Sequence, residues 1–376
     1  MIRINNKKKI HIIAEIGVNH NGNIALAKRL ILEAKKSGAD SVKLQTYNTD
    51  EIVVEHTKKA KYQIMNTQND ESQYEMLKKY ELSNKNYLDL IVYAKKINIE
   101  LFSTACDIES LYYLSKRLKF KTIKISSSDL TNIPLLILAG SSNKNIIIST
   151  GMGTIEEIDI ALSALAYGYH NCNKTYSSKF NIKKHSNIYK KHKSYLSKKV
   201  SLLHCTTDYP ASNDELNINV IDDFKKRYDM KIGYSDHSND LLTPIIVASK
   251  NIDIIEVHVT IDKSMPGPDH ICSLDMKEFR QYVSNLRKTE VMLGNFKKKP
   301  TKSEIKNIKS VRKSLVINQD LNKNDKLSIH NLTVKRPGNG ISAIFYNEYL
   351  GKTLKKKLRK NHLLKKDDIN YDDTKR

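Results

Sequence analysis

The sequence predicts a (β/α)₈ barrel, an α/β fold also called a TIM barrel, followed by a small C-terminal domain. Eight short apolar runs alternate with eight helix-length amphipathic segments, which is the pattern of consecutive parallel strands and covering helices. These pairs occupy residues 1–293, which suits a barrel of about 250 residues with insertions. A doubly wound open sheet is the alternative, but eight consecutive strand–helix pairs favour closure.

The expected elements follow from the spacing of apolar residues, because short β-branched runs predict buried strands and helical spacing predicts amphipathic helices. The expected barrel strands are residues 10–16, 40–46, 99–103, 121–126, 145–149, 199–204, 231–235 and 253–259. The expected helices are residues 23–37, 84–97, 107–118, 132–139, 154–166, 214–228, 241–250 and 275–293. Parallel strands joined in this way have their C-terminal ends at one rim.

Two excursions interrupt this alternation. Residues 47–83 leave the second strand at its C-terminal end, so they are expected to lie over the barrel mouth. Residues 170–198 are rich in Lys, Ser, Asn and Tyr and contain no acidic residue. This composition predicts a low-complexity, loosely ordered insert without a catalytic role.

The pattern changes after residue 293. The polar, Lys-rich residues 294–309 are expected to form a linker. Residues 310–376 contain strand-like runs at 314–317 and 331–335, separated by turn signals. They predict a small separate domain.

The charge is strongly positive, with 64 basic and 41 acidic residues and a net charge of +23. Such a balance raises nucleic acid or an acidic membrane as partners. The lysines are thinly spread and are not interleaved with aromatic residues, so a small anionic substrate is expected instead, with no nucleic acid and no membrane as partners. The four cysteines form no C-x-x-C pair, and no apolar run reaches the length of a membrane span, so we expect a reduced, cytoplasmic protein.

Two histidines are expected at the same rim of the barrel. His237 follows the seventh strand, and His258 lies near the end of the eighth. Two imidazoles brought together in this way suit a borderline divalent metal ion. The alternative is a pair of unrelated histidines, one capping a helix and one packed in a wall.

Two lysines lie inside β-branched strands. Lys43 and Lys124 are costly to bury without an anionic partner. The alternatives are a structural ion pair with a core carboxylate such as Glu15, or lysine side chains that extend to the rim. Taken together, they predict a cradle for a phosphate and a carboxylate group. The hydroxyl groups that would complete this cradle are those of Thr104, Ser127, Ser149 and Ser235.

Other polar residues follow strand ends. Glu15 ends the first strand and is a candidate for accepting a proton or holding a substrate hydroxyl. Asp269 follows a rigid Pro-Gly-Pro run, where it is either a turn residue or a carboxylate that faces substrate hydroxyls. His20 and Asn21 are expected to cap the first helix.

Seven motifs, in this order along the chain, resemble those of the sialic acid synthases, which use phosphoenolpyruvate. They are residues 14–22 (AEIGVNHNG), 42–46 (VKLQT), 148–152 (ISTGM), 203–205 (LHC) with Tyr209-Pro210, 235–237 (SDH), 267–270 (GPDH) and 336–340 (RPGNG). The resemblance extends from about residue 10 to residue 369 and is broken only by the insert at 170–198.

The resemblance implies a barrel followed by an antifreeze-like (SAF) domain, in a domain-swapped homodimer. It implies a transferase that forms a carbon–carbon bond between phosphoenolpyruvate and open-chain N-acetylmannosamine, with N-acetylneuraminate as product. The alternative within the family is a legionaminate synthase, which takes 2,4-diacetamido-2,4,6-trideoxymannose. A non-catalytic protein that binds an anionic ligand is the alternative from another class.

The resemblance also implies roles for individual residues. The expected catalytic residues are Glu15, His237 and His258, of which the two histidines match ligands of Mn²⁺ or, alternatively, Mg²⁺ or Co²⁺. Positions that match the phosphoenolpyruvate site are Lys43, Thr104, Lys124, Ser127, Ser149 and Ser235. Positions that match sugar contacts are Glu15, Thr207, Tyr209 and Asp269, together with Arg336, which matches an arginine that reaches into the partner's active site.

The chain also departs from the family's pattern at three places, one of which is residues 102–107 (FSTACD), where Ser-Thr-Pro-Phe-Asp is common in the family. Many relatives have Gly-Glu where this chain has Ser128-Asp129, and many have a lysine where it has Val257. None of these differences replaces an expected ligand.

Overall fold

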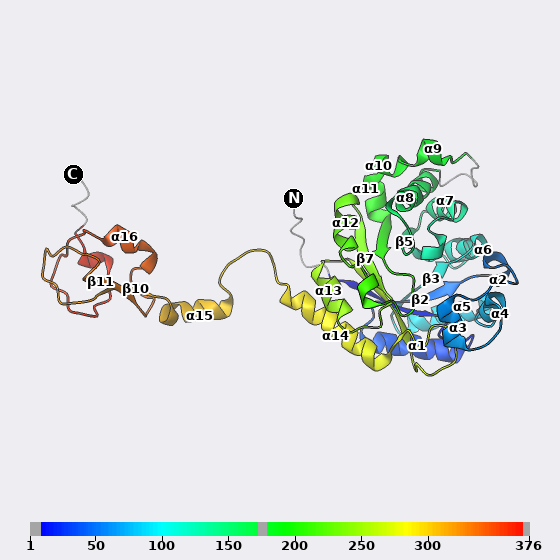
Figure 1. Cartoon of the computed structure of the whole chain (residues 1–376), viewed down its shortest axis with the longest axis horizontal. Coiled ribbons are helices and arrows are strands. Elements are labelled where there is room, and N and C mark those ends of the chain that lie inside the picture. Colours follow the sequence, from blue (N-terminus) through cyan, green and yellow to red (C-terminus); the bar gives the residue numbers. More distant parts are fainter. Residues whose placement is uncertain (1–8, 172–178, 371–376) are drawn as a thin grey trace. The chain divides into compact units, whose positions relative to one another are not determined.

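The computed structural model describes residues 9–171 and 179–370 of the chain. The chain forms two compact units, Met1–Gly294 and Asn295–Arg376 (Figure 1). Among the described residues, no helix combines the length and the apolar character needed to span a bilayer.

The first unit is built on a closed parallel barrel, as predicted. Neighbouring strands pair in sequence order, and β1 also pairs with β8, which closes the sheet. The barrel strands are β1 (His11–Gly17), β2 (Ser41–Thr46), β3 (Glu100–Ala105), β4 (Thr122–Ile125), β5 (Asn145–Ser149), β6 (Val200–His204), β7 (Lys231–Asp236) and β8 (Ile254–Thr260). All eight expected strands are confirmed to within two residues. A short strand, β9 (Leu274–Asp275), pairs in parallel with the end of β8.

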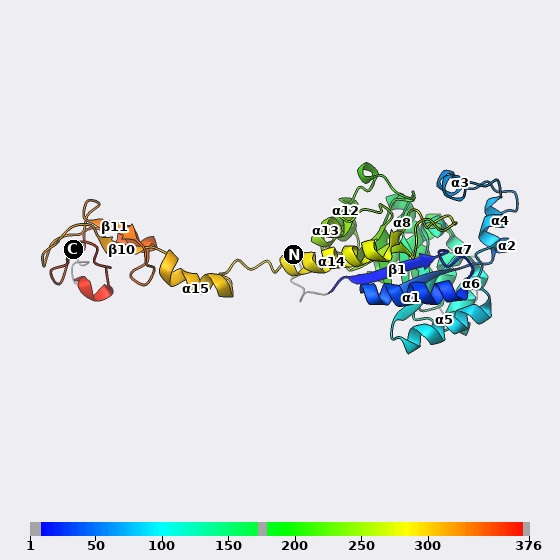
Figure 2. The same ribbon diagram turned by 90° about the horizontal axis from the view of Figure 1, so that it is seen from below.

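Helices surround the barrel (Figures 1 and 2). They are α1 (Ile24–Ser37), α5 (Asn84–Lys96), α6 (Ile108–Tyr112), α7 (Ile133–Ser141), α8 (Ile155–His170), α12 (Val220–Arg227), α13 (Thr243–Ser249) and α14 (Met276–Met292). The expected helix at 107–118 is split, because α6 runs into a π-helical turn at Tyr113–Arg117. The expected helix at 214–228 begins only at Val220, because Asn217 adopts a left-handed backbone with φ 45°.

The first helix is capped by Asn23, so the expected capping by His20 and Asn21 is wrong. Asn23 Oδ1 accepts hydrogen bonds from the backbone N–H groups of Ala25 (2.8 Å) and Leu26 (3.1 Å). Asn21 instead donates from Nδ2 to the carbonyl of Pro266 at 3.0 Å. The turn before α1 therefore holds the loop that follows β8.

Successive side chains of each barrel strand point outward and inward in turn, and they form two separate apolar cores. Outward-facing residues such as Val42 and Leu44 join the large core between strands and helices. The inward-facing Ile13, Phe102, Ile147, Leu203 and Ile254 form a separate cluster inside the barrel. Because successive side chains point to opposite faces, the next inward position on each strand lies one layer nearer the C-terminal rim. These inward positions carry the polar groups of the candidate site.

Helices α7 and α8 pack backbone to backbone, and this contact gives a stability prediction. A Cβ atom added at Gly168 would lie 2.0 Å from the carbonyl oxygen of Ile137, which cannot move without displacing α7. We expect Gly168→Ala to lower the free energy of unfolding by about 2 kcal/mol, because overpacking outweighs the helix propensity gained. Urea denaturation measures this, with Glu156→Ala on the exposed face of α8 as the control; equal stability of both variants would contradict the packing argument.

The two excursions contain short helices. Residues 47–83 form α2 (Thr49–Ile52), α3 (Lys61–Thr67) and α4 (Gln73–Lys78). In Figure 2, α3 lies beyond the end toward which β1 runs. Asn66 Nδ2 on α3 donates to the carbonyl of Pro268 at 2.6 Å, so α3 lies at the barrel mouth, as expected.

The expectation of a loosely ordered insert at 170–198 is wrong for its described part. Residues 179–199 form α9 (Ile182–His185), α10 (Ile188–Lys191) and α11 (Lys193–Lys199). Tyr189 and Leu196 are buried in the main core, and Ser163 of α8 donates to the carbonyl of Ser186 at 2.7 Å. A few apolar residues therefore anchor a segment whose composition is otherwise polar. Residues 172–178 lie outside the described residues.

The second unit has its own core and a two-stranded antiparallel sheet. The sheet pairs β10 (Ser314–Ile317) with β11 (Leu332–Lys335), which confirms the two strands expected there. The short helix α16 (Tyr346–Tyr349) follows. Part of the expected linker is helical, because α15 spans Lys302–Val311. The Thr301 side chain and the Glu304 carboxylate cap its N-terminus reciprocally, a T-x-x-E signal that the sequence carries.

Candidate active site

The polar residues of the barrel interior form one layer at the C-terminal rim. Strand register places Glu15 beside Lys43 of β2 and beside His258 of β8. In the same way, Thr104 lies beside Lys124, and Ser235 lies beside Glu256. The inward residues of the deeper apolar cluster, such as Ile13 and Ile254, lie two positions earlier on their strands. The strand ends therefore bring together side chains that are far apart in the sequence.

Lys43 lies at the centre of this layer, and its side chain is only 4% exposed. Its ammonium group forms a salt bridge with Glu15, donates to Thr104 Oγ1 at 2.8 Å and lies 3.6 Å from Glu256 Oε1. Burial acts to lower the pKa of Lys43, but Glu15 and Glu256 outweigh burial and raise it. Lys43 is therefore a buried ammonium ion. The ion pair with Glu15, which the sequence analysis gave as an alternative, is present and forms part of the same cluster.

Lys124 is the second buried ammonium group. Its Nζ donates to Ser149 Oγ at 2.6 Å and lies 3.7 Å from Glu256 Oε1. Burial lowers the pKa of Lys124, although the negative charge of Glu256 opposes this. Lys43 and Lys124 thus share one carboxylate while each donates to a hydroxyl group of a neighbouring strand.

Glu256 is a site residue that the sequence reasoning missed. Its Oε1 is within 3.7 Å of both ammonium groups and accepts from Ser235 Oγ at 3.2 Å. Burial acts to raise its pKa, but Lys124 and Lys43 outweigh this and lower it to about 2. Its Oε2 is buried and has no hydrogen-bond partner among the described residues. The signal was available, because Glu256 precedes His258 by two positions and so shares its face of the strand.

His237 and His258 lie together at the rim, with ring centroids 5.5 Å apart. The Nδ1 of His237 donates to the carbonyl of Thr206 at 2.6 Å, which leaves Nε2 as the acceptor nitrogen. Burial lowers the pKa of His237 to about 4 and also lowers that of His258, so both rings are neutral at pH 7. Neutral imidazole is the form that binds metal ions.

This pair can hold a divalent ion. His258 Nδ1 is buried, has no hydrogen-bond partner among the described residues, and lies 3.6 Å from Asp269 Oδ2. In the described part of the chain, no group of three or more His, Cys, Asp or Glu side chains is arranged as a metal site. An ion held by the two imidazoles would therefore keep open positions for water and substrate, as catalytic ions do.

Aromatic rings cover the histidine pair. The ring of Tyr209 lies 4.3 Å from that of His237 and 5.6 Å from that of His258. The ring of Tyr62, on α3, lies 5.0 Å from that of Tyr209. Tyr62 is a second residue that the sequence reasoning missed, because the strand ends do not indicate which helix of an excursion faces the barrel mouth.

Asp269 is a buried carboxyl group of the same rim. Burial raises the pKa of Asp269 to about 7, with Glu15 as a further cause.

The remaining expected residues divide between the two units. Ser127 lies just after β4, where its Oγ accepts from the backbone N–H of Gly151 at 3.0 Å and lies 3.2 Å from Cys205 Sγ. Thr207 follows β6, and its buried Oγ1 has no hydrogen-bond partner among the described residues. Arg336 follows β11 in the second unit, where it is exposed.

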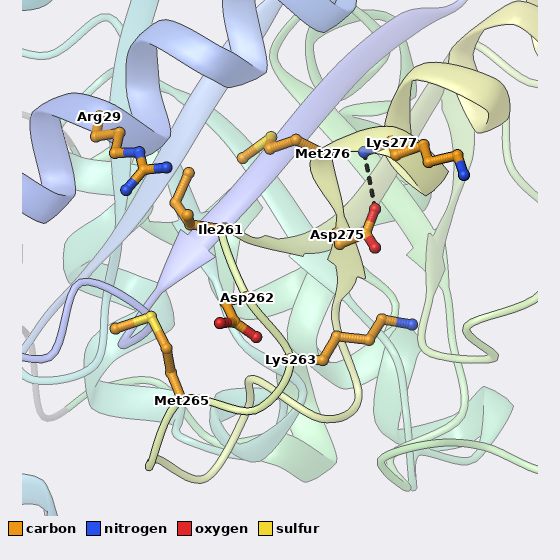
Figure 3. Close-up of a pocket in the computed structure, with 8 residues that line it drawn as sticks. All are labelled: Arg29, Ile261, Asp262, Lys263, Met265, Asp275, Met276 and Lys277. Carbon is orange, nitrogen blue, oxygen red and sulfur yellow. Dashed lines mark hydrogen bonds between the residues drawn. The ribbon is translucent and has the colours of Figure 1, made fainter.

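A pocket of 570 Å³ lies outside this cluster (Figure 3). It is lined by the loop after β8, the start of α14 and Arg29 of α1, and within it Asp275 accepts from the backbone N–H of Lys277 at 2.8 Å. None of the lysines, histidines or hydroxyl groups described above lines it. Its walls carry both signs of charge, so it shows no preference for an anion.

The arrangement at the rim suits a small anion beside a polarised carbonyl group. Two ammonium groups and a ring of hydroxyl groups can bind a phosphate and a carboxylate. Two neutral imidazoles lie next to them and can hold an ion that polarises an oxygen atom. The buried charges of Lys43, Lys124, Glu15 and Glu256 balance, so an incoming anion meets a site without excess negative charge.

Comparison with known proteins gives a family for both units. The family model described as the NeuB family matches residues 30–298, and the model of the SAF domain matches residues 312–370. A protein of Campylobacter jejuni named N,N'-diacetyllegionaminic acid synthase is 42% identical over 358 residues, which cover 95% of this chain and 99% of that protein. A protein of the same name from Legionella pneumophila is 37% identical and covers 91% of this chain and 90% of its own length.

A solved structure is similar to both the fold and the sequence. It is described as the N-acetylneuraminic acid (sialic acid) synthetase of Leptospira borgpetersenii in complex with citrate. It is 30% identical, covers 81% of this chain and 92% of its own length, and has a TM-score of 0.64.

Proposed function

The chain belongs to the NeuB family and carries a C-terminal SAF domain, and from this premise we propose that it is an N,N'-diacetyllegionaminic acid synthase. The proposed reaction joins phosphoenolpyruvate to open-chain 2,4-diacetamido-2,4,6-trideoxymannose and releases phosphate. The observation that carries this choice is the 42% and 37% identity to two synthases of that name. Sequence motifs alone favour N-acetylneuraminate synthesis, which becomes the second candidate because the sialic acid synthetase structure is only 30% identical.

The two buried lysines supply the proposed phosphoenolpyruvate site. Lys43 and Lys124 bear the positive charge, and the hydroxyl groups of Thr104 and Ser149 already lie 2.8 Å and 2.6 Å from their ammonium groups. Charge-assisted hydrogen bonds of this kind orient an anion as well as bind it. Because the substrate is held rigidly, its C3 carbon can be presented to the aldehyde in reacting geometry.

The histidines supply the proposed metal site. His237 and His258 would hold a divalent ion, for which Mn²⁺ is our first candidate and Mg²⁺ and Co²⁺ are alternatives. When bound, the ion supplies a Lewis acid for the aldehyde oxygen. The Thr206 carbonyl fixes the tautomer of His237, and the ring of Tyr209 helps to exclude water from the pair.

The bond changes balance with one water molecule. A bond forms between C3 of phosphoenolpyruvate and C1 of the sugar as the C2=C3 double bond opens, and the π electrons of the aldehyde pass to its oxygen, which takes up a proton. Water adds at C2, the C2–oxygen bond to phosphate breaks, and C2 becomes a ketone. Of the two protons that the water gives up, one balances the new sugar hydroxyl and the other leaves with phosphate. Glu15, buried beside Lys43, is our candidate for accepting a proton that this water loses. Asp269, which lies 3.6 Å from His258, is our candidate for holding a sugar hydroxyl.

The substrate choice gives a direct prediction. With Mn²⁺ present, we expect phosphate release from phosphoenolpyruvate to be at least about tenfold faster, in kcat/KM, with 2,4-diacetamido-2,4,6-trideoxymannose than with N-acetylmannosamine. A coupled phosphate assay, with a no-sugar control, measures both rates. A preference for N-acetylmannosamine would favour the second candidate, and no release with either sugar would favour the inert, anion-binding alternative.

We also propose that Arg336 acts in a domain-swapped homodimer, as the family resemblance implies. Arg336→Ala is expected to raise the KM for the sugar about tenfold or more, since a hydrogen bond to a charged group contributes about 1.5–3 kcal/mol. The KM for phosphoenolpyruvate should change little. Arg359→Ala, an exposed arginine of the same unit, is the matched control.

Coexpression with a second variant tests whether this arginine acts between chains. In a heterodimer of Arg336→Ala with Lys124→Met, an intact barrel would face an intact arginine from the other chain. About half of the wild-type activity per dimer should then return, because one of two sites is complete. No recovery in a purified heterodimer would place Arg336 at its own chain's site.

A further inference from the structure

A continuous line of contacts leads from the buried lysines to α3. Glu256 Oε1 lies 3.7 Å from Lys124 and 3.2 Å from Ser235 Oγ, which in turn lies 3.3 Å from His237 Nε2. The ring of Tyr209 lies 4.3 Å from that of His237, and the ring of Tyr62 lies 5.0 Å farther on. Along this line of contacts, Tyr62 is therefore the residue farthest from the lysines.

The helix that carries Tyr62 is braced at both ends. Lys59 Nζ, before α3, donates to Thr67 Oγ1 at 2.7 Å and to the carbonyl of Asn69 at 2.8 Å. Asn66, four residues after Tyr62 and so on the same face of the helix, donates to the carbonyl of Pro268 at 2.6 Å. The ring of Tyr62 is thereby a fixed wall beside the loop that carries Asp269.

This line of contacts defines how the open-chain sugar would be oriented between the histidines and Tyr62. The carbon that forms the new bond, C1, has to meet phosphoenolpyruvate above the lysines and histidines. The far end of the open sugar chain, C4 to C6, then extends toward Tyr209 and Tyr62. At this end the two candidate sugars differ: one carries an acetamido group on C4 and a methyl group at C6, and the other carries hydroxyl groups at both positions.

We propose that Tyr62 determines sugar specificity by packing its ring against the C4 acetamido group and the C6 methyl group. This inference rests on the proposed function. An aromatic face gains free energy from covering methyl groups and gains little from covering a hydrated hydroxyl group. Together with the ring of Tyr209, it forms an apolar wall that favours the deoxy, diacetylated sugar over N-acetylmannosamine.

The test compares both sugars with wild-type protein and three variants. For Tyr62→Ala, the ratio of kcat/KM between the diacetamido sugar and N-acetylmannosamine should fall at least about tenfold, the discrimination that a hydrophobic pocket gives for one or two carbon atoms. Tyr62→Phe keeps the ring and should keep the ratio. Met65→Ala alters a side chain of α3 that is 70% exposed and should also leave the ratio unchanged. The KM for phosphoenolpyruvate should stay constant in all three.

Two results would overturn the inference while leaving the proposed function intact. One is a wild-type enzyme that prefers the diacetamido sugar and a Tyr62→Ala variant whose kcat/KM is undiminished toward both sugars. The other is an equal loss of activity toward both sugars in Tyr62→Ala, which would give Tyr62 a structural role only. A wild-type protein that prefers N-acetylmannosamine would instead overturn the proposed function, and with it the assignment of Tyr62.

Discussion

Replacing His237 by alanine is expected to lower kcat/KM for phosphate release on the order of 10³-fold. The reason is that polarisation by a bound ion stabilises the transition state by several kcal/mol, and each 1.36 kcal/mol corresponds to a tenfold change in rate. The ring that is lost has its Nδ1 hydrogen-bonded to the Thr206 carbonyl and its Nε2 at 3.3 Å from Ser235 Oγ, within the site. Only one imidazole of the pair would remain.

Metal binding supplies a second readout for the His237 variant. Wild-type protein treated with a chelator should lose activity and regain it with Mn²⁺, and calorimetry should detect Mn²⁺ binding to wild type and much weaker binding to the variant. His330→Ala, an exposed histidine of the second unit, is the matched control. Undiminished turnover or undiminished Mn²⁺ affinity in His237→Ala would remove this histidine from the proposed metal site.

Replacing Lys124 by methionine is expected to lower kcat/KM for phosphoenolpyruvate by at least about 10²-fold, mainly through a higher KM, because a buried charge-assisted hydrogen bond contributes about 1.5–3 kcal/mol and the anion also loses a charge partner. Lys231→Met is a close control. Lys231 also lies on a barrel strand, but at the opposite, N-terminal end, where it is exposed. Steady-state kinetics with phosphoenolpyruvate varied at saturating sugar distinguish the two variants.

The Lys124 variant also tests the charge balance of the site. Removing one ammonium group leaves Glu256 with Lys43 alone, which already forms a salt bridge with Glu15. Breaking a buried charge pair costs about 3–5 kcal/mol, so Lys124→Met should unfold at lower urea concentration. Lys124→Met/Glu256→Gln should recover part of this stability but none of the activity. A double variant as active as wild type would contradict the cradle.

Local sequence patterns were sufficient for most of the barrel and for much of the site. Each expected strand is present because β-branched runs flanked by turns have few other ways to bury both faces. Lys43 and Lys124 could be identified because a lysine is conspicuous in such a run. Glu256 was missed although it lies two residues before His258, because a glutamate close to a candidate metal ligand is a weaker signal than a lysine between two isoleucines.

Polar segments were predicted less well. Composition alone gave no sign that Tyr189 and Leu196 would anchor the described part of the insert to the core. The helix Lys302–Val311 was missed because its hydrophobic positions are sparse, although its capping box is plain in the sequence. In both cases a few residues determine the structure, and composition averaged over a stretch of sequence does not reveal them.

By itself, the sequence determined the order of the strands, the face of each strand that carries polar groups and the family to which the motifs belong. Only the tertiary structure decided that one carboxylate, Glu256, lies between two lysines and that Tyr62, on a helix of the excursion after β2, reaches the histidine pair through Tyr209. The physical reason is that strand periodicity acts over two residues, whereas a contact between a loop helix and a distant strand end depends on closure of the whole barrel.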